Sequence, residues 1–107
     1  TKPKNSLDAK KILEKLSNHT HQVITGVCIR SQNKEHTFSN TTEVTFNKLN
    51  DNDIDYYIKQ FNPYDKAGSY GIQEWIGLIG VKKIKGSYTN VVGLPSSQVY
   101  QELNKFI

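Results

Sequence analysis

The residues best suited to chemistry lie in one stretch, 61–95, where polar side chains are mixed with glycines and aromatic rings. The stretch holds six of the seven glycines, the only tryptophan and two of the three prolines. Glycines at this density permit close backbone approach and unusual dihedral angles. Two interpretations fit equally well: a set of tight turns between strands, or a ligand-binding surface. The polar side chains in the stretch include Asp65, Lys66, Ser69, Gln73 and Asn90.

Two further groups of residues resemble metal ligands only in outline. His19 and His21 are two apart, but no third ligand stands at a suitable spacing, so we expect neither a metal nor a DNA site there. The aspartates at 51, 53 and 55 outline a calcium loop that lacks its glycine and its terminal glutamate. We interpret them as the cap and the acidic first turn of a helix.

Composition limits the class of protein. The length of 107 residues and the ordinary charged and apolar fractions predict a single folded domain, 1–107. The net charge of +4 comes from scattered lysines and a single arginine, Arg30, whereas nucleic-acid binders more often cluster arginines with aromatic rings. No apolar run reaches the roughly 18 residues of a membrane span, and no signal peptide opens the chain. We expect no nucleic-acid or membrane partner. Cys28, inside the apolar run VITGVCI, is predicted to be a buried thiol in a reducing cytosol.

Periodicity predicts the elements that must position these residues. A helix is expected over 6–17, capped by Asn5 or Ser6, with an apolar stripe of Leu7, Ile12, Leu13 and Leu16. Residues 22–30 are β-branched or apolar for nearly their whole length and predict a strand covered on both faces. A polar turn at 31–35, a returning strand at 36–39 and an alternating strand at 42–46 follow.

The second half of the chain predicts three more elements. Ile54, Tyr57, Ile58 and Phe61 have helical spacing, and Pro63 ends that helix. Residues 75–85 are expected to form a strand with glycines as bulge points. Pro95 opens a last helix, whose core-facing residues would be Val99, Leu103 and Phe106. The order of elements predicts an α/β or α+β fold.

Two motifs then give the chain a resemblance to a known family. They are PYDKAGSYGIQ at 63–73 and IKGSYTNVVGLP at 84–95. Together with THQVITGV at 20–27 and Lys2-Pro3, they have the order and spacing of the Maf family, and the resemblance covers essentially the whole chain. It implies a mixed twisted sheet flanked by helices, as in inosine-triphosphate pyrophosphatases. It also implies that an N-terminal half is missing, because a complete Maf protein is nearly twice this length.

The resemblance implies an activity. Maf proteins are cytosolic nucleoside triphosphate pyrophosphatases, once named for septum formation, in which water attacks the α-phosphorus to give a monophosphate and pyrophosphate. Such chemistry implies a divalent ion, Mg²⁺ or Mn²⁺. The aspartate taken as general base belongs to the missing half, so no catalytic residue is expected here and the chain alone is expected to be inactive. We also expect a homodimer in the cytoplasm. The alternative is a non-catalytic remnant that binds a nucleotide or a partner.

The resemblance also implies roles for single residues. Lys2 matches the lysine that meets the substrate's phosphates. Gln73 matches a glutamine of the subgroup that acts on dTTP and UTP, and its carboxamide offers the donor and acceptor that complement a uracil or thymine edge. A subgroup that prefers methylated guanine nucleotides lacks this Gly-Ile-Gln. For Asp65, a salt bridge or turn cap and a ligand contact stay open. Shaping and supporting roles are expected for Asp65, Lys66, Tyr70, Ser87 and Asn90.

Overall fold

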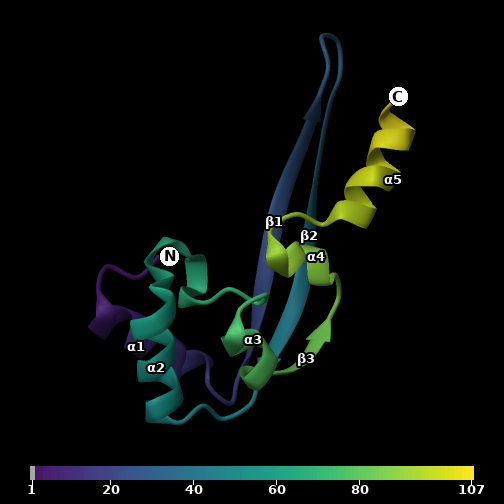
Figure 1. The fold of residues 1–107 in the computed structure, drawn as a ribbon. Helices are drawn as coiled ribbons and strands as arrows, with labels where there is room; N and C mark the ends of the chain where they lie inside the picture. The colour runs from purple at the N-terminus through teal and green to yellow at the C-terminus, as the bar shows by residue number, and fades with distance from the viewer. Residues whose placement is uncertain (1) are drawn as a thin grey trace. The chain divides into compact units, whose positions relative to one another are not determined.

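A computed structural model describes residues 2–107, apart from the side chain of Ala67. Figure 1 shows helices combined with a sheet of antiparallel strands in the order β1-β2-β3. This combination confirms the predicted α/β class. The elements are α1 (Ser6–Leu16), β1 (Thr20–Arg30), β2 (Glu35–Phe46), α2 (Asp51–Phe61), the 3₁₀ turns η1 (Pro63–Asp65) and η2 (Ala67–Ser69), α3 (Trp75–Gly80), β3 (Val81–Lys85), α4 (Tyr88–Val92) and α5 (Ser96–Phe106).

The described chain forms two units. Unit 1 comprises the residues up to His21 together with Val44–Lys83, and unit 2 comprises Gln22–Glu43 together with Ile84–Ile107. The single domain expected from the chain length stays a prediction. Within the described residues, no helix is both long and apolar enough to cross a membrane.

Helices α1 and α2 of unit 1 begin as their sequences predict. The Asn5 carboxamide accepts a hydrogen bond from the Asp8 N–H at 2.9 Å, and the Asn50 carboxamide accepts one from the Asp53 N–H at 2.8 Å. Each cap satisfies an N–H group that the first turn leaves free. The stripe of α1 is narrower than predicted, because Leu7 is 63% exposed.

The two helices pack with neighbouring segments around an apolar core. Helix α1 lies against α2 and the 3₁₀ turn η2. Ser17 joins α1 to the start of α2, since its hydroxyl accepts a hydrogen bond from the Leu49 N–H at 2.6 Å. The buried apolar side chains of this unit include Ala9, Leu13, Val44, Phe46, Leu49, Ile54, Tyr57, Ile58, Tyr70, Ile72 and Ile76.

Strands β1 and β2 form one long hairpin, with its turn at residues 31–34 (Figure 1). The returning strand and the strand at 42–46 were predicted separately, but they are one continuous strand, β2. The prediction that β1 is covered on both faces is wrong. Burial alternates along β1, so that Ile24 is 63% exposed and Cys28 is exposed rather than buried. An apolar run in an edge strand therefore does not show that both faces of the strand are covered by other elements.

The predicted strand at 75–85 divides into helix α3 and the short strand β3. Ile76 is fully buried while Leu78 is 83% exposed, so these two residues do not share a face as they would in a strand. Instead Ile76 and Gly80, one helical turn apart, are buried. Gly77 is required by close packing, because a Cβ there would lie 1.9 Å from the Ile72 carbonyl oxygen.

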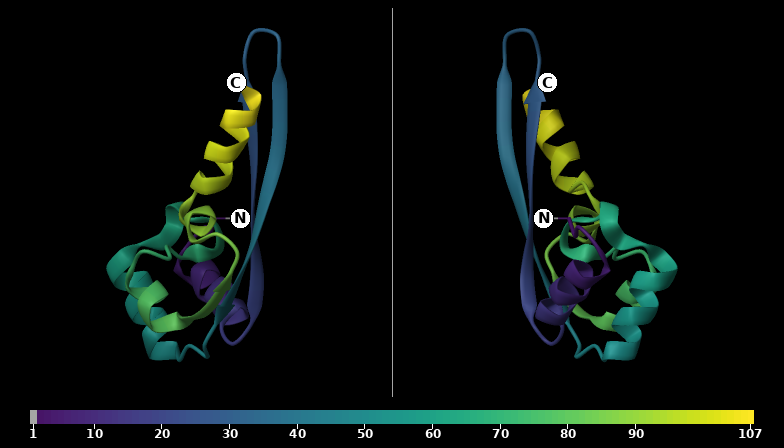
Figure 2. Two further views of the ribbon diagram at one scale, coloured as in Figure 1. Left: turned by 90° about the vertical axis from the view of Figure 1, so that its right-hand side faces the viewer. Right: turned by 90° about the vertical axis from the view of Figure 1, so that its left-hand side faces the viewer.

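Helix α5 of unit 2 lies beside the hairpin, as both views in Figure 2 show, and it is not a core helix. It begins after Pro95 as predicted, but none of its residues is buried. Val99 and Phe106 are only partly covered and Leu103 is 37% exposed, so the expected core face is wrong. Polar contacts join α5 to β2: the Asn40 amide donates to Gln98 at 2.6 Å.

Candidate functional site

A tight turn from Gly71 to Glu74 presents Gln73 to solvent. The Glu74 N–H donates to the Gly71 carbonyl oxygen at 3.0 Å, and α3 begins at the next residue. Ile72 is buried at 8% exposure, whereas Gln73 is exposed. The buried side chain anchors the turn in the core of unit 1 and leaves the carboxamide free to meet a ligand. Its role as a binding residue stays a prediction.

One buried hydroxyl, that of Tyr57, holds both ends of this turn. It accepts a hydrogen bond from the Gly71 N–H at 3.0 Å and donates one to the Glu74 carboxylate at 2.6 Å. Burial, and then the bond to Glu74, raise the pKa of the Tyr57 phenol, so it keeps its proton. The Lys66 ammonium lies 3.9 Å from the same carboxylate oxygen. The sequence pattern predicted Tyr57 as part of a helix with apolar spacing, and it gave no role to Glu74.

The Glu74 and Lys66 side chains lie close to Gly71, so that a side chain there would require both of them to move. A Cβ there would lie 2.6 Å from the Glu74 carboxylate oxygen and 2.8 Å from the Lys66 side chain. Asp65 stands at the edge of this group, 3.5 Å from the Lys66 ammonium and largely exposed. Of the alternatives left open for Asp65, this contact supports the salt bridge, although an exposed pair of this kind contributes little stability.

The segment 68–70 precedes the turn, and its first two residues have left-handed backbone conformations. Gly68 has φ 77° and Ser69 has φ 68°, a region that non-glycine residues rarely adopt. Tyr70 is nearly buried, and its hydroxyl lies 2.7 Å from the His21 Nε2 atom. The Phe46 ring packs edge-on against Tyr70 at 5.0 Å. Burial lowers the pKa of His21 and raises that of Tyr70, which keeps both side chains neutral near pH 7.

Lys2 is exposed immediately before Pro3, whose side chain is buried. The buried proline fixes the backbone next to the lysine, while the ammonium reaches solvent. Lys2 and Gln73 both belong to unit 1. The role of Lys2 in phosphate binding and that of Gln73 in base reading stay predictions.

Ser87 and Asn90 belong to unit 2, whereas Gln73 belongs to unit 1. Ser87 caps α4 by accepting a hydrogen bond from the Asn90 N–H at 3.2 Å. The Asn90 side chain is 1% exposed, and its amide lies within hydrogen-bonding distance of the Val23 carbonyl, the Asn40 carbonyl and the Thr42 hydroxyl. These contacts tie α4 to two strands.

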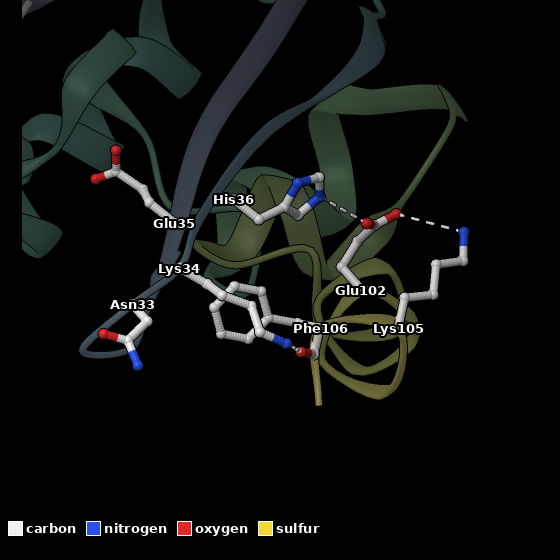
Figure 3. Close-up of a pocket in the computed structure, with 7 residues that line it drawn as sticks. All are labelled: Asn33, Lys34, Glu35, His36, Glu102, Lys105 and Phe106. Carbon is white, nitrogen blue, oxygen red and sulfur yellow. Dashed lines mark hydrogen bonds and ion pairs between the residues drawn. The ribbon is translucent and has the colours of Figure 1, made fainter.

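Unit 2 also contains an open cavity of about 520 Å³ between the hairpin turn and the end of α5 (Figure 3). The His36 imidazole and the Glu102 carboxylate point toward each other at 2.7 Å, and Lys105 lies 3.8 Å from Glu102. The Lys34 ammonium donates to the Phe106 carbonyl oxygen at 2.8 Å. These charges already have partners within the chain, so the cavity does not identify a ligand.

A second cavity, of about 500 Å³, lies between α1 and α2 in unit 1. Its charged lining includes Lys10 and Asp55, which lie 3.3 Å apart. Neither cavity includes Lys2 or Gln73. Gln73 itself is exposed on its turn.

The described part of the chain contains no group of three or more His, Cys, Asp or Glu side chains that could hold a metal ion. At the turn, the Glu74 carboxylate could serve as one ligand, but it is already bound to Tyr57 and faces Lys66. The donor set of these residues does not fit a metal ion held by this chain. The expected need for Mg²⁺ or Mn²⁺ stays a prediction.

Comparison with known proteins identifies the class. A family described as "Maf-like protein" matches residues 1–106, and the chain therefore belongs to the Maf family. The turn that carries Gln73 and the helix cap at Ser87 thus lie within a known family fold, as the two motifs predicted.

Three relatives are named dTTP/UTP pyrophosphatase. That of Phocaeicola vulgatus is 60% identical over 104 residues, which are 97% of this chain and 54% of the relative. That of Flavobacterium psychrophilum is 60% identical over 99 residues, 92% of this chain and 51% of the relative. That of Parabacteroides distasonis is 55% identical over 105 residues, 98% of this chain and 54% of the relative. The chain spans about half the length of the curated relatives it matches.

Proposed function

We propose that this chain is the base-reading part of a nucleoside triphosphate pyrophosphatase that acts on dTTP and UTP. The observation that carries the proposal is the exposed Gln73 carboxamide, on a turn anchored at both ends, in a chain whose relatives are named dTTP/UTP pyrophosphatases. A carboxamide presents one acceptor and one donor group, which complement the N3–H and the O4 carbonyl of uracil or thymine.

Recognition by such a pair is specific because a mismatched base leaves a polar group unpaired. A cytosine edge presents an amino donor and a ring acceptor at the same positions, so the carboxamide would have to turn over to match it. The hydrogen bonds at Gly71 and Glu74 hold the backbone from which the Gln73 side chain would reach the base. Lys2 would meet the phosphates as an exposed point charge beside the fixed Pro3 backbone.

The proposed reaction is attack of water on the α-phosphorus of the nucleoside triphosphate, which breaks the bond to the α,β-bridging oxygen and gives the nucleoside monophosphate and pyrophosphate. This chain contributes binding groups, and the general-base aspartate is expected in the part that the relatives have in addition. The proposal includes Mg²⁺ or Mn²⁺, a homodimer and a cytoplasmic location. Solution size measured over a range of concentrations tests the homodimer.

The test is a hybrid enzyme in which this chain replaces the matching segment of the Phocaeicola vulgatus relative, with which it is 60% identical. We expect pyrophosphate release from dTTP and UTP in the presence of Mg²⁺, at rates near those of the relative itself. A folded hybrid that hydrolyses neither nucleotide would contradict the proposal.

The 107-residue chain alone is the matched control. We expect it to release no pyrophosphate from dTTP or UTP with Mg²⁺ or Mn²⁺, because the proposed general base is absent. Turnover by the purified chain would overturn this division of labour. Nucleotide binding by the chain without turnover agrees with it.

A further inference from the structure

We propose that Tyr57 and Glu74 are positioning residues that fix the orientation of Gln73 toward the base. The inference deepens the proposed function and rests on it. It assigns a specificity role to a buried tyrosine and to a carboxylate, neither of which has to touch the nucleotide.

The Tyr57 hydroxyl oxygen takes part in two hydrogen bonds, which together we call the relay. The Gly71 N–H donates to the Tyr57 hydroxyl at 3.0 Å, and the hydroxyl donates to the Glu74 carboxylate at 2.6 Å. Gly71 and Glu74 are the two ends of the turn, and Gln73 lies between them. A single hydroxyl therefore joins the two ends of the turn.

The relay is built on a rigid base. Tyr57 is fully buried on α2, its ring stacks on Phe61 at 5.2 Å, and Ile72 inside the turn is also buried. The Lys66 ammonium also lies 3.9 Å from the Glu74 carboxylate. The turn thus has few ways to move as long as the relay is intact.

A fixed turn matters because a base edge is read by direction. A carboxamide that samples several orientations pays the cost of ordering when the nucleotide binds, and it accepts wrong bases more readily. If the relay is broken, affinity and base discrimination should fall. The rate of the chemical step at saturation should change little, because the phosphates are held elsewhere.

The experiment uses the hybrid enzyme with Tyr57→Phe, which deletes only the central hydroxyl. We expect the KM for dTTP and UTP to rise roughly tenfold, with kcat within about twofold of the parent. The preference for UTP over CTP should fall by a similar factor. The matched control is Tyr56→Phe, which removes a hydroxyl from the neighbouring, half-exposed tyrosine outside the relay and should leave both values unchanged.

Glu74 provides a second pair of variants. Glu74→Gln keeps an acceptor for the Tyr57 hydroxyl and should retain most of the affinity, whereas Glu74→Ala should behave like Tyr57→Phe. This pair decides the question if Tyr57→Phe fails to fold. Hydrogen exchange of the Gly71 amide in the 107-residue chain reports the relay independently of activity, and it should accelerate in Tyr57→Phe.

The outcomes separate the two proposals. An inactive parent hybrid overturns the proposed function and this inference with it. An active parent whose Tyr57→Phe and Glu74→Ala variants keep the parental KM and UTP/CTP preference overturns this inference alone, even if exchange at Gly71 becomes faster. Raised KM and lost preference, with Tyr56→Phe unchanged, support the relay.

Discussion

Units 1 and 2 are stabilised in different ways. The buried apolar side chains of the described residues, Pro95 aside, all belong to unit 1, where α1, α2 and α3 contribute to one core. In unit 2 the buried side chains besides Pro95 are polar, Thr42 and Asn90, and α5 buries none of its residues. Apolar burial stabilises one unit, whereas hydrogen bonds and partly exposed ion pairs stabilise the other.

The difference explains where a precise site can lie. An apolar core provides most of the stability of a folded domain and restricts the segments attached to it. The turn of Gln73 is attached to such a core through Ile72 and Tyr57. Surface pairs such as His36–Glu102 contribute less and depend on conditions. Lys2 and Gln73, the residues proposed to bind the nucleotide, are in unit 1, which is the unit with the apolar core.

The largest expected effect is the loss of a core side chain. Leu13→Ala, at a fully buried position of α1, should lower the free energy of unfolding by about 2–5 kcal/mol. Leu103→Ala, the same change on α5 at a position that is 37% exposed, should cost less than about 1 kcal/mol. Urea denaturation of both variants measures the difference. Equal losses would remove the distinction between the two units.

A smaller loss is expected at the buried polar centre of unit 2. Asn90→Ala removes the amide that contacts the Val23 and Asn40 carbonyls, which should cost about 1–3 kcal/mol. Asn104→Ala, at an exposed position of α5, is the matched control and should be near neutral. Thermal unfolding compares them. A neutral Asn90→Ala would show that hydrogen bonding does not hold unit 2 together.

The smallest expected effect is a pH dependence from His21. Burial lowers its pKa in the folded chain below the ordinary value of 6.5. The unfolded chain then binds more protons, so stability is complete above about pH 6.5 and declines as pH falls toward the folded pKa. His21→Gln keeps a hydrogen-bonding group for Tyr70 without titrating and should reduce this slope. Denaturant midpoints between pH 7.5 and 5 test it, and an unchanged slope would refute it.

Sequence periodicity predicted the elements whose burial is one-sided over several turns. The stripe at Ile54, Tyr57 and Ile58 gave α2, and Asn50 marked its start. The short apolar run at 75–80 was misread as a strand, because an apolar run of six residues fits a strand and a helix equally. Gly77 packs against the Ile72 carbonyl oxygen in the helix that forms, a tertiary contact that the apolar pattern does not indicate.

The sequence pattern also could not predict which side chains tertiary contacts bury. Cys28 was predicted to be buried because its neighbours are apolar, yet it lies on the uncovered face of β1. The motifs singled out Gln73 as a binding residue, which stays a prediction, but they did not show that Tyr57 of α2 supports its turn. Tyr57 offered a signal, because a buried tyrosine hydroxyl needs a partner. Glu74, next to Gln73, is that partner.

The most direct test of base reading by Gln73 is the specificity of the hybrid enzyme after Gln73→Glu. The carboxylate keeps an acceptor but loses the donor to the base carbonyl, so kcat/KM for dTTP and UTP should fall roughly 10- to 100-fold relative to purine triphosphates. Gln101→Glu makes the same chemical change on the exposed side of α5 and should alter nothing. Unchanged relative rates across nucleotides in Gln73→Glu would contradict the account.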